Sequence, residues 1–475
     1  MMNFRTLWFA AMTSALGGFL FGYDWVVIGG AKPFYEAYFG LVSPHQEAWA
    51  MSCALVGCLA GAMSSGLLSE RAGRRGTLLI AAAAFALSAL GTGMAWSFTS
   101  FVAWRIAGGV AIGLASALSP IYIAEIAPAR IRGKLVCLNE LTIVIGILSA
   151  QTVNWMIAKP VPVGTSIVEI QTSWNGQVAW RHMFEAAFFP SVVFLMGLLA
   201  IPESPRWLAL KGRRQSAQAA LVRLGGEKYA AEVEREIESS FSTETRSEVR
   251  IALRHPRMRR VLTVGIVLAV LQQWCGINVI FNYAQEVFSA AGYPLSGIFL
   301  NIVITGVTMC VFTFVAIATV ERLGRRRLMI LGCGTLAVLY AVLGGLYLAH
   351  QHGLLLMIAV IAAIATYAMT LAPVTWVVLS EIFPTEVRGV FMAICTAALW
   401  LACFLLTYSF PLLNAALGTA YTFWIYALVC LLGMIFVMRR LPETKKHSLE
   451  SIQALWGTSE HQKTPVSTGN QKSTG

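Results

Sequence analysis

Twelve windows of about 20 mostly apolar residues recur along this 475-residue chain, and they limit its fold more strongly than any other feature. A helix of that length matches the hydrocarbon thickness of a bilayer. The hydrophobic share of 57%, the charged share of 12% and the mean hydropathy of +0.68 exceed what a soluble core can hide. We therefore predict an all-α membrane protein with spans near residues 6–30, 47–69, 77–96, 100–125, 135–158, 182–201, 260–288, 295–320, 328–349, 354–380, 388–415 and 420–438.

The placement of the basic residues predicts the orientation of these spans. The formal net charge is +12, and 31 of the 35 Lys and Arg share one side of the membrane if the N-terminus is cytoplasmic. Lys32, Lys159 and Arg181 fall on the other side, and Arg105 lies within or at the end of a span. This asymmetry follows the positive-inside rule and predicts that both termini are cytoplasmic. The basic surface is expected to face lipid headgroups and cytosol, with no nucleic acid as partner.

The sequence indicates neither a cleaved secretory signal nor a metal site. The first window is too long for a secretory signal, carries Asp24 and shows no convincing small-residue cleavage site, so it is expected to be the first span. The nine cysteines contain no Cys-x-x-Cys pair, and all but Cys137 lie in apolar windows, which predicts buried thiols. The seven histidines form no metal-like or nucleophile–base cluster, so we expect no enzyme activity, catalytic residue, metal or cofactor.

Three charged cassettes occur twice, separated by between 240 and 256 residues. They are Glu70 to Arg75 with Glu321 to Arg326, Glu125 to Gly133 with Glu381 to Gly389, and Pro202-Glu-Ser-Pro with Pro442-Glu-Thr-Lys. Paired cassettes at nearly one spacing predict two homologous six-helix halves, at residues 1–205 and 259–445. A carrier built in this way has its substrate site between the halves, near the membrane midplane.

The cassettes bring Arg and Glu together at predicted cytoplasmic helix ends, which is typical of a gate that locks the halves and releases them. Basic loops that only obey the positive-inside rule are the alternative, and the duplicated glutamates count against it. The candidate gate residues are Glu70, Arg71, Arg74, Arg75, Glu125, Arg132, Glu203, Glu321, Arg322, Arg325, Arg326, Glu381, Arg388 and Glu443.

Residues 206–258 are polar and separate the halves. Ser204-Pro205 predicts a helix start, residues 215–224 an amphipathic helix that stops at Gly225-Gly226, and residues 230–237 a second short helix. We interpret them as cytoplasmic linker helices. In the tail, residues 446–475, a further short helix is expected at 448–456 and disorder after about 457.

Asp24 is the only aspartate in the chain and lies within an apolar run, Phe19 to Ile28. A carboxylate at the centre of a spanning helix costs roughly 2.5 to 3.5 kcal/mol on insertion scales, so it needs a partner and usually has a task. A fixed structural ion pair remains the alternative interpretation.

The seventh window holds the densest set of polar residues, with Gln272, Gln273, Asn278 and Asn282 around Gly276. Their arc is too wide for one helix face, so we predict local unwinding at Gly276 that turns the amides toward a cavity. Amides both donate and accept, as a polyhydroxylated neutral ligand requires. Interhelical hydrogen bonding is the alternative. In the tenth and eleventh windows, Trp376 beside a helix-breaking Pro373, and Trp400, offer indole faces to a sugar ring or pack the bundle.

Together these motifs resemble the sugar porter family of the major facilitator superfamily, and within it the bacterial proton-coupled D-xylose symporters more than the facilitative glucose transporters. The resemblance extends through Trp456. It implies a twelve-helix fold with alternating access and a monosaccharide held mainly by the second half. It assigns sugar contacts to Gln272, Gln273, Asn278, Trp376 and Trp400, and proton coupling to Asp24 with Arg105 as its charge partner.

The sequence also departs from the pattern of the xylose symporters. Where they carry polar residues, this chain has Ile147, Asn282, Met309 and Leu399, and their Gly-Pro is Ala372-Pro373. Ile147, Asn282 and Met309 are therefore candidate substrate-site residues of altered chemistry. Because an unmatched buried partner discriminates strongly between ligands, no single sugar is transferred to this chain.

The sequence thus predicts a proton-driven importer of a pentose, hexose or related polyol in the bacterial inner membrane, working as a monomer with the proton as coupling ion. A facilitative uniporter is the first alternative, with Asp24 and Arg105 as a fixed pair. A transporter-like sugar sensor is less favoured, since such sensors commonly bear long cytoplasmic tails.

Overall fold

The computed structural model describes residues 5–162, 165–240, 256–290, 292, 295–351, 353–383 and 387–443 of the chain. The first half contains α1 (Arg5–Phe39), α2 (Pro44–Gly93), α3 (Phe98–Ile126), α4 (Ala129–Ile157), α5 (Ile167–Thr172), η1 (Asn175–Ala179), α6 (Trp180–Glu185) and α7 (Phe188–Ala200). The connecting helices are α8 (Pro205–Leu210), α9 (Arg214–Gly225) and α10 (Glu227–Ser240). The second half contains α12 (Pro256–Trp274), α13 (Ile277–Asn282), α14 (Ala284–Ala290), α15 (Leu295–Leu323), α16 (Arg325–Leu348), α17 (Leu354–Met369), α18 (Leu371–Ile382), α19 (Arg388–Leu417) and α20 (Thr419–Arg440).

Each of the twelve predicted windows is mostly helical in the structure. Within the described residues, 11 helical stretches are long and apolar enough to cross a membrane. One of them, α2, covers two of the predicted windows. These two spans are separated at Gly73, where the backbone leaves the helical region (φ 84°, ψ 172°) and the chain turns. A residue with a Cβ rarely adopts that φ. The prediction of an all-α bundle of apolar helices is confirmed.

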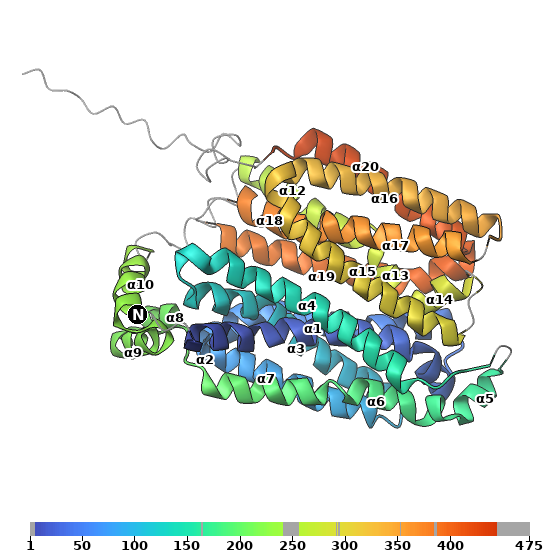
Figure 1. Ribbon diagram of the computed structural model, residues 1–475, viewed down its shortest axis with the longest axis horizontal. Helices are drawn as coiled ribbons and strands as arrows, with labels where there is room; N and C mark the ends of the chain where they lie inside the picture. The colour runs from blue at the N-terminus through green and yellow to red at the C-terminus, as the bar shows by residue number, and fades with distance from the viewer. Residues whose placement is uncertain are drawn as a thin grey trace, which may run out of the picture.

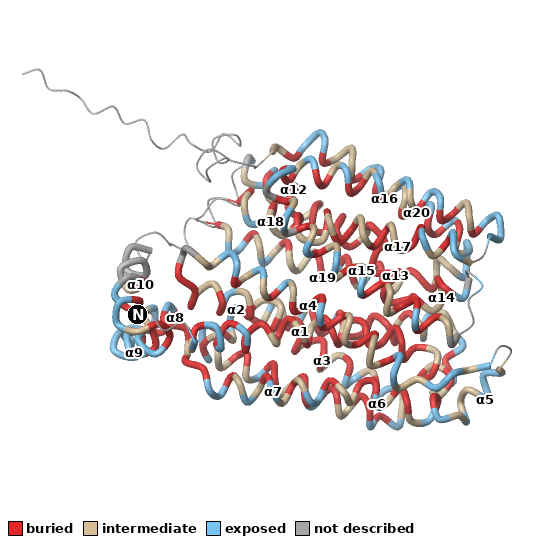
Figure 2. Tube along the Cα trace, in the orientation of Figure 1, coloured by how far each residue is buried: buried red, intermediate tan, exposed pale blue. Residues whose placement is uncertain are grey.

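Two groups of roughly parallel helices lie side by side, α1–α7 in one and α12–α20 in the other (Figure 1). They meet where α1 contacts α13 and α14, where α2 contacts α19, and where α4 contacts α15. Buried residues follow the inside of this bundle, and exposed positions its outer face (Figure 2). Large apolar side chains such as Phe189 and Met196 are exposed there, as lipid contact requires.

The connecting helices α8, α9 and α10 lie together at one end of the bundle (Figure 1). Ser204 caps α8 by accepting a hydrogen bond from the backbone N–H of Trp207, and Gly226 (φ 86°) ends α9. Both features follow the sequence prediction, and α10 is longer than expected. The predicted helix at 448–456 and the tail after 457 lie outside the described residues.

Glycines allow α2 and α3 to pack backbone to backbone. A Cβ on Gly109 would overlap the carbonyl oxygen of Ala54, and one on Gly57 would overlap that of Ile106. We expect Gly109→Ala to lower the free energy of unfolding in detergent by about 1–3 kcal/mol, because overpacking forces helices apart. The control is Gly66→Ala in α2, where an added Cβ meets no atom within 4 Å. Equal melting temperatures for the two variants would contradict this prediction.

Candidate functional site

The carboxylate of Asp24 and the guanidinium of Arg105 form an ion pair between α1 and α3. Arg105 Nη1 donates to Asp24 Oδ1 at 2.7 Å, and Nη2 lies 3.4 Å from the Asp24 carbonyl oxygen. The Asp24 side chain is 11% exposed and the Arg105 side chain 2%. The guanidinium carbon also lies 5.3 Å from the centre of the Phe184 ring. This geometry supplies the partner that a carboxylate at this depth requires.

One oxygen of the carboxylate is left available. Asp24 Oδ2 is buried and, among the described residues, has no hydrogen-bond partner. Close by, a cavity of about 10 Å³ is lined by Arg105, Trp25 and Asn282 among others, which is room for about one water molecule. Because Asn282 belongs to the second half, this small cavity connects the ion pair with the seam between the halves.

The seventh predicted span is broken in the structure, as expected. The helix α12 ends at Trp274, Gly276 adopts a left-handed conformation (φ 86°, ψ −4°), and α13 begins at Ile277. A side chain at Gly276 would also press against the Tyr426 ring, with the added Cβ 2.8 Å from its Cγ. The break lets amides from both sides of the glycine approach one another.

Three of the four predicted amides form one buried chain. Gln273 Nε2 donates to Gln272 Oε1, and Asn278 Nδ2 donates to Gln273 Oε1. Gln272 Nε2 in turn donates to the Tyr367 hydroxyl at 2.9 Å. The fourth amide, Asn282, is also buried, and its Oδ1 has no partner among the described residues. Such a chain can exchange internal hydrogen bonds for those of a ligand's hydroxyls.

The two predicted tryptophans differ in their surroundings. Trp400 is buried, and its ring centre lies 5.8 Å from that of Phe21 and 5.9 Å from that of Trp25, both on α1. Its Nε1 has no partner within the described residues. Trp376 is only partly buried on α18. An apolar indole face with an unused N–H is what a sugar ring can contact.

The predicted span that carries Trp376 is broken just before Pro373, as its helix-breaking proline predicts. The chain leaves the helical region at Thr370 (φ −123°, ψ −86°), and Pro373 lies in the first turn of α18. That position suits proline, because the first N–H groups of a helix have no partner within it. Pro373 also lacks the N–H that would bond the Met369 carbonyl four residues earlier, which accounts for the break at Thr370.

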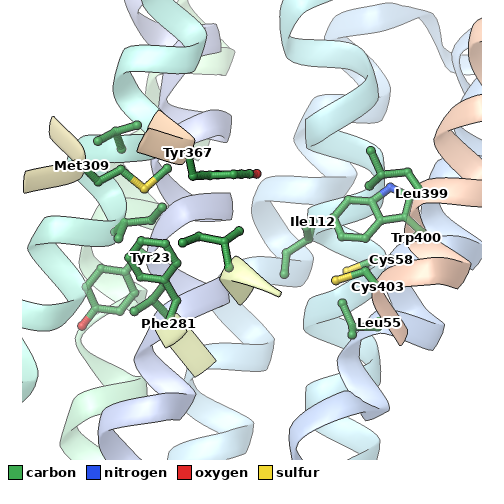
Figure 3. Packing of buried hydrophobic residues seen from close by; sticks show 14 of the residues in the cluster. Tyr23, Leu55, Cys58, Ile112, Phe281, Met309, Tyr367, Leu399, Trp400 and Cys403 are labelled. Carbon is green, nitrogen blue, oxygen red and sulfur yellow. The ribbon is translucent and has the colours of Figure 1, made fainter. Parts of the chain in front are cut away.

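Three of the positions where the xylose symporters carry a polar residue are apolar in this chain and lie at the interface between the halves. Ile147, Met309 and Leu399 are buried, and Figure 3 shows Leu399 beside Trp400 and Met309 near Tyr367. On the same stretch of α4 as Ile147, Gln151 Nε2 lies 3.3 Å from the Thr305 hydroxyl across the seam. The halves thus meet through a mostly apolar surface with few polar contacts.

Sequence reasoning missed two polar residues of this region. Tyr367 gave no pattern, since a single tyrosine in an apolar window is unremarkable, yet it partners Gln272. Glu140 lies on α4, seven residues before Ile147, and is exposed. An acidic residue inside the window 135–158 satisfies the criterion that singled out Asp24, and the same search would have found it.

The first set of cassettes ties three helix ends together. Arg74 Nη2 lies 3.0 Å from Glu125 Oε1, and its Nε lies 3.1 Å from both carboxylate oxygens. Glu203 accepts the backbone N–H groups of Arg74 and Arg75 at 3.0 Å, under the turn at Gly73. The second set repeats this: Arg325 Nη2 lies 3.0 Å from Glu381 Oε1, and Glu443 accepts the Arg325 N–H at 3.0 Å.

The remaining cassette residues mostly bind backbone carbonyls. Arg75 donates to Leu198 and Leu199, Arg132 to Ala127, Arg326 to Met438, and Arg388 to Phe383. The Glu70 carbonyl accepts from Trp207 Nε1, Arg71 and Arg322 are exposed, and the Glu321 side chain lies outside the described part. Each of these contacts lies within one half or, for Glu70 and Trp207, between the first half and α8, so they brace helix ends. That the cassettes also lock the two halves together stays a prediction.

Two halves of apolar helices, a buried acid–base pair in one and a broken amide-lined helix in the other define a membrane carrier of small molecules. Residues 10–456 match the family described as sugar (and other) transporter, and the chain belongs to this family.

The chain is 36% identical to the D-xylose-proton symporter of Escherichia coli K12 over 94% of both chains, and 36% identical to the arabinose-proton symporter of Bacillus subtilis over 93% of both. A solved structure of the xylose transporter from E. coli in a partially occluded inward-open conformation matches with a TM-score of 0.81 at 34% identity, over 93% of this chain and 99% of that one.

Proposed function

We propose that the protein is a proton-coupled symporter that imports a monosaccharide or related polyol by alternating access. One observation carries the proposal: the Asp24–Arg105 pair lies in the first half, apart from the chain of amides in the second. A carrier needs one site for the proton and another for the sugar, with a way for each to influence the other. The relatives named for proton-coupled xylose and arabinose transport support this assignment.

In the proposed cycle, a proton from outside binds Asp24 and weakens its ion pair with Arg105. The unpartnered Oδ2 is the atom on which the proton can arrive without first breaking the 2.7 Å contact at Oδ1. Helices α1 and α3 then shift relative to each other, and because α1 packs against Trp400 and α13, the shift reaches the sugar site. Release of the proton to the cytoplasm restores the pair.

We further propose that the protein works as a monomer in the bacterial inner membrane with both termini cytoplasmic, and that it needs no cofactor and performs no enzymatic reaction. A facilitative uniporter is the competing function, because a buried ion pair can also be purely structural. The two functions differ in whether sugar uptake carries protons.

The proposal is tested with purified protein in proteoliposomes. Pentoses, hexoses and inositols are compared as competitors of uptake at two external pH values, and the external pH is followed when sugar is added. We expect one group of sugars to compete, acidic external medium to raise uptake, and sugar addition to make the medium more alkaline. Sugar uptake with no change in external pH would favour the uniporter.

A further inference from the structure

Lys32, a buried lysine at the end of the bundle opposite α8–α10, lies close to three carboxylates. The side chain of Lys32 is 4% exposed, and its Nζ lies 2.9 Å from Glu36 Oε1 and 3.6 Å from Glu47 Oε2. The same nitrogen forms an ion pair with Glu286 Oε1. It also lies 5.8 Å from the centre of the Tyr283 ring. By the positive-inside pattern, Lys32 belongs to the outer side of the membrane.

Only one of the three carboxylates belongs to the other half. Lys32 and Glu36 lie on α1 and Glu47 on α2, whereas Glu286 lies on α14. The Lys32–Glu286 ion pair therefore bridges the two halves, and α14 lies at the end of the bundle away from α8–α10 (Figure 1).

Two more contacts cross the seam near this ion pair. The rings of Phe34 and Phe299 stack with centres 6.0 Å apart, and His45 Nδ1 lies 3.2 Å from the Tyr408 hydroxyl. The outer ends of the halves are thus closed on each other in this conformation. The solved structure reported above is described as a partially occluded inward-open conformation, which agrees with an outer side that is shut.

We propose that Lys32 and Glu286 form a latch that keeps the outer side closed and breaks when the site opens to the outside. The inference rests on the proposed alternating access. Its charge arrangement suits a reversible contact: when Glu286 moves away, Lys32 keeps Glu36 and Glu47 in its own half, so no unpaired ammonium is left buried. Glu286 Oε2 has no partner among the described residues, so hydration on opening offsets part of the lost attraction.

The test measures how often the outer side opens. Spin labels are placed at the exposed positions Val42, between α1 and α2, and Leu354, at the start of α17, in a Cys137→Ser background. Distances are recorded by double electron–electron resonance without sugar. We expect Glu286→Gln to raise the ratio of long to short distances about tenfold or more, because breaking a buried bridging charge pair favours separation.

The matched control is Glu47→Gln, which removes a carboxylate of the same cluster without touching a contact between halves; its ratio is expected to change far less. Lys32→Met is expected to raise the ratio, and the Lys32→Met/Glu286→Gln double variant to raise it by less than the product of the two effects, since both act on one pair. Glu286→Asp, which keeps the charge but shortens the reach, should give a smaller shift and carries the test if Glu286→Gln does not fold.

An unchanged distance ratio in Glu286→Gln or Glu286→Asp, or an equal shift in Glu47→Gln, would overturn the latch. Because the distances are measured without sugar or a proton gradient, they report on the latch even if the protein proves to be a uniporter. Conversely, a failed latch leaves the proton and sugar measurements unaffected.

Discussion

Asp24→Asn is expected to abolish proton-driven accumulation while sugar exchange across the membrane continues. The asparagine keeps the size of the side chain and can still accept a hydrogen bond from Arg105, but it cannot bind and release a proton. With no coupling free energy between the two ligands, the internal to external sugar ratio should fall to about 1 under an inward proton gradient. Counterflow, which needs only alternating access, should persist.

The measurement is radiolabelled sugar uptake in proteoliposomes, with and without an imposed pH gradient, followed by counterflow on the same preparation. Glu169→Gln is the control, since Glu169 is an exposed carboxylate on α5 whose hydrogen bonds go to Ser166. It should accumulate sugar like the unmodified protein. Uphill uptake by Asp24→Asn at the unmodified level would show that the Asp24–Arg105 pair is structural and not coupling.

Gln272→Leu is expected to weaken sugar binding by roughly ten- to a hundredfold, which corresponds to about 1–3 kcal/mol for an unmatched buried hydrogen-bonding group. The change removes the N–H that donates to the Tyr367 hydroxyl and the oxygen that accepts from Gln273, so both residues lose a hydrogen-bond partner. Leucine fills a similar volume, which limits the loss of packing. The affinity is measured by titration calorimetry with the sugar that competes best in the uptake panel.

Two variants make the result specific. Gln215→Leu, at an exposed position on α9, makes the same chemical change away from the seam and should leave affinity unchanged. Tyr367→Phe removes only the hydroxyl partner of Gln272 and should have a smaller effect than Gln272→Leu. If Gln272→Leu binds sugar as tightly as the unmodified protein, the amides serve only to hold the helices together.

The sequence predicted best what depends on short stretches of chain. Gly276 was expected to interrupt its helix, and it does so because glycine adopts positive φ without strain and broken helices line cavities in carriers. Pro373 was likewise expected to break its helix, and the chain leaves the helical region at Thr370, because Pro373 has no N–H to bond the Met369 carbonyl. Local rules state where a break is tolerated, and packing against neighbours selects among those places.

The polar contacts between helices were predicted less completely. The resemblance to the sugar porters suggested Arg105 as the partner of Asp24, and the two side chains do meet. The ion pairs of Arg74 and Arg325 each lie within one half, and the expectation that the cassettes also join the halves stays a prediction. The cluster around Lys32 was not predicted, because the sequence does not show which carboxylates a charge beside an apolar window will meet.

By itself, then, the sequence determined the twelve apolar helices, their duplication and the residues able to carry charge or hydrogen bonds within them. These follow from the length and polarity of individual segments, which a bilayer restricts almost residue by residue. Only the tertiary structure decided which charges meet. Lys32 and Glu286 are more than 250 residues apart in the chain, and their contact depends on how the two halves pack against each other.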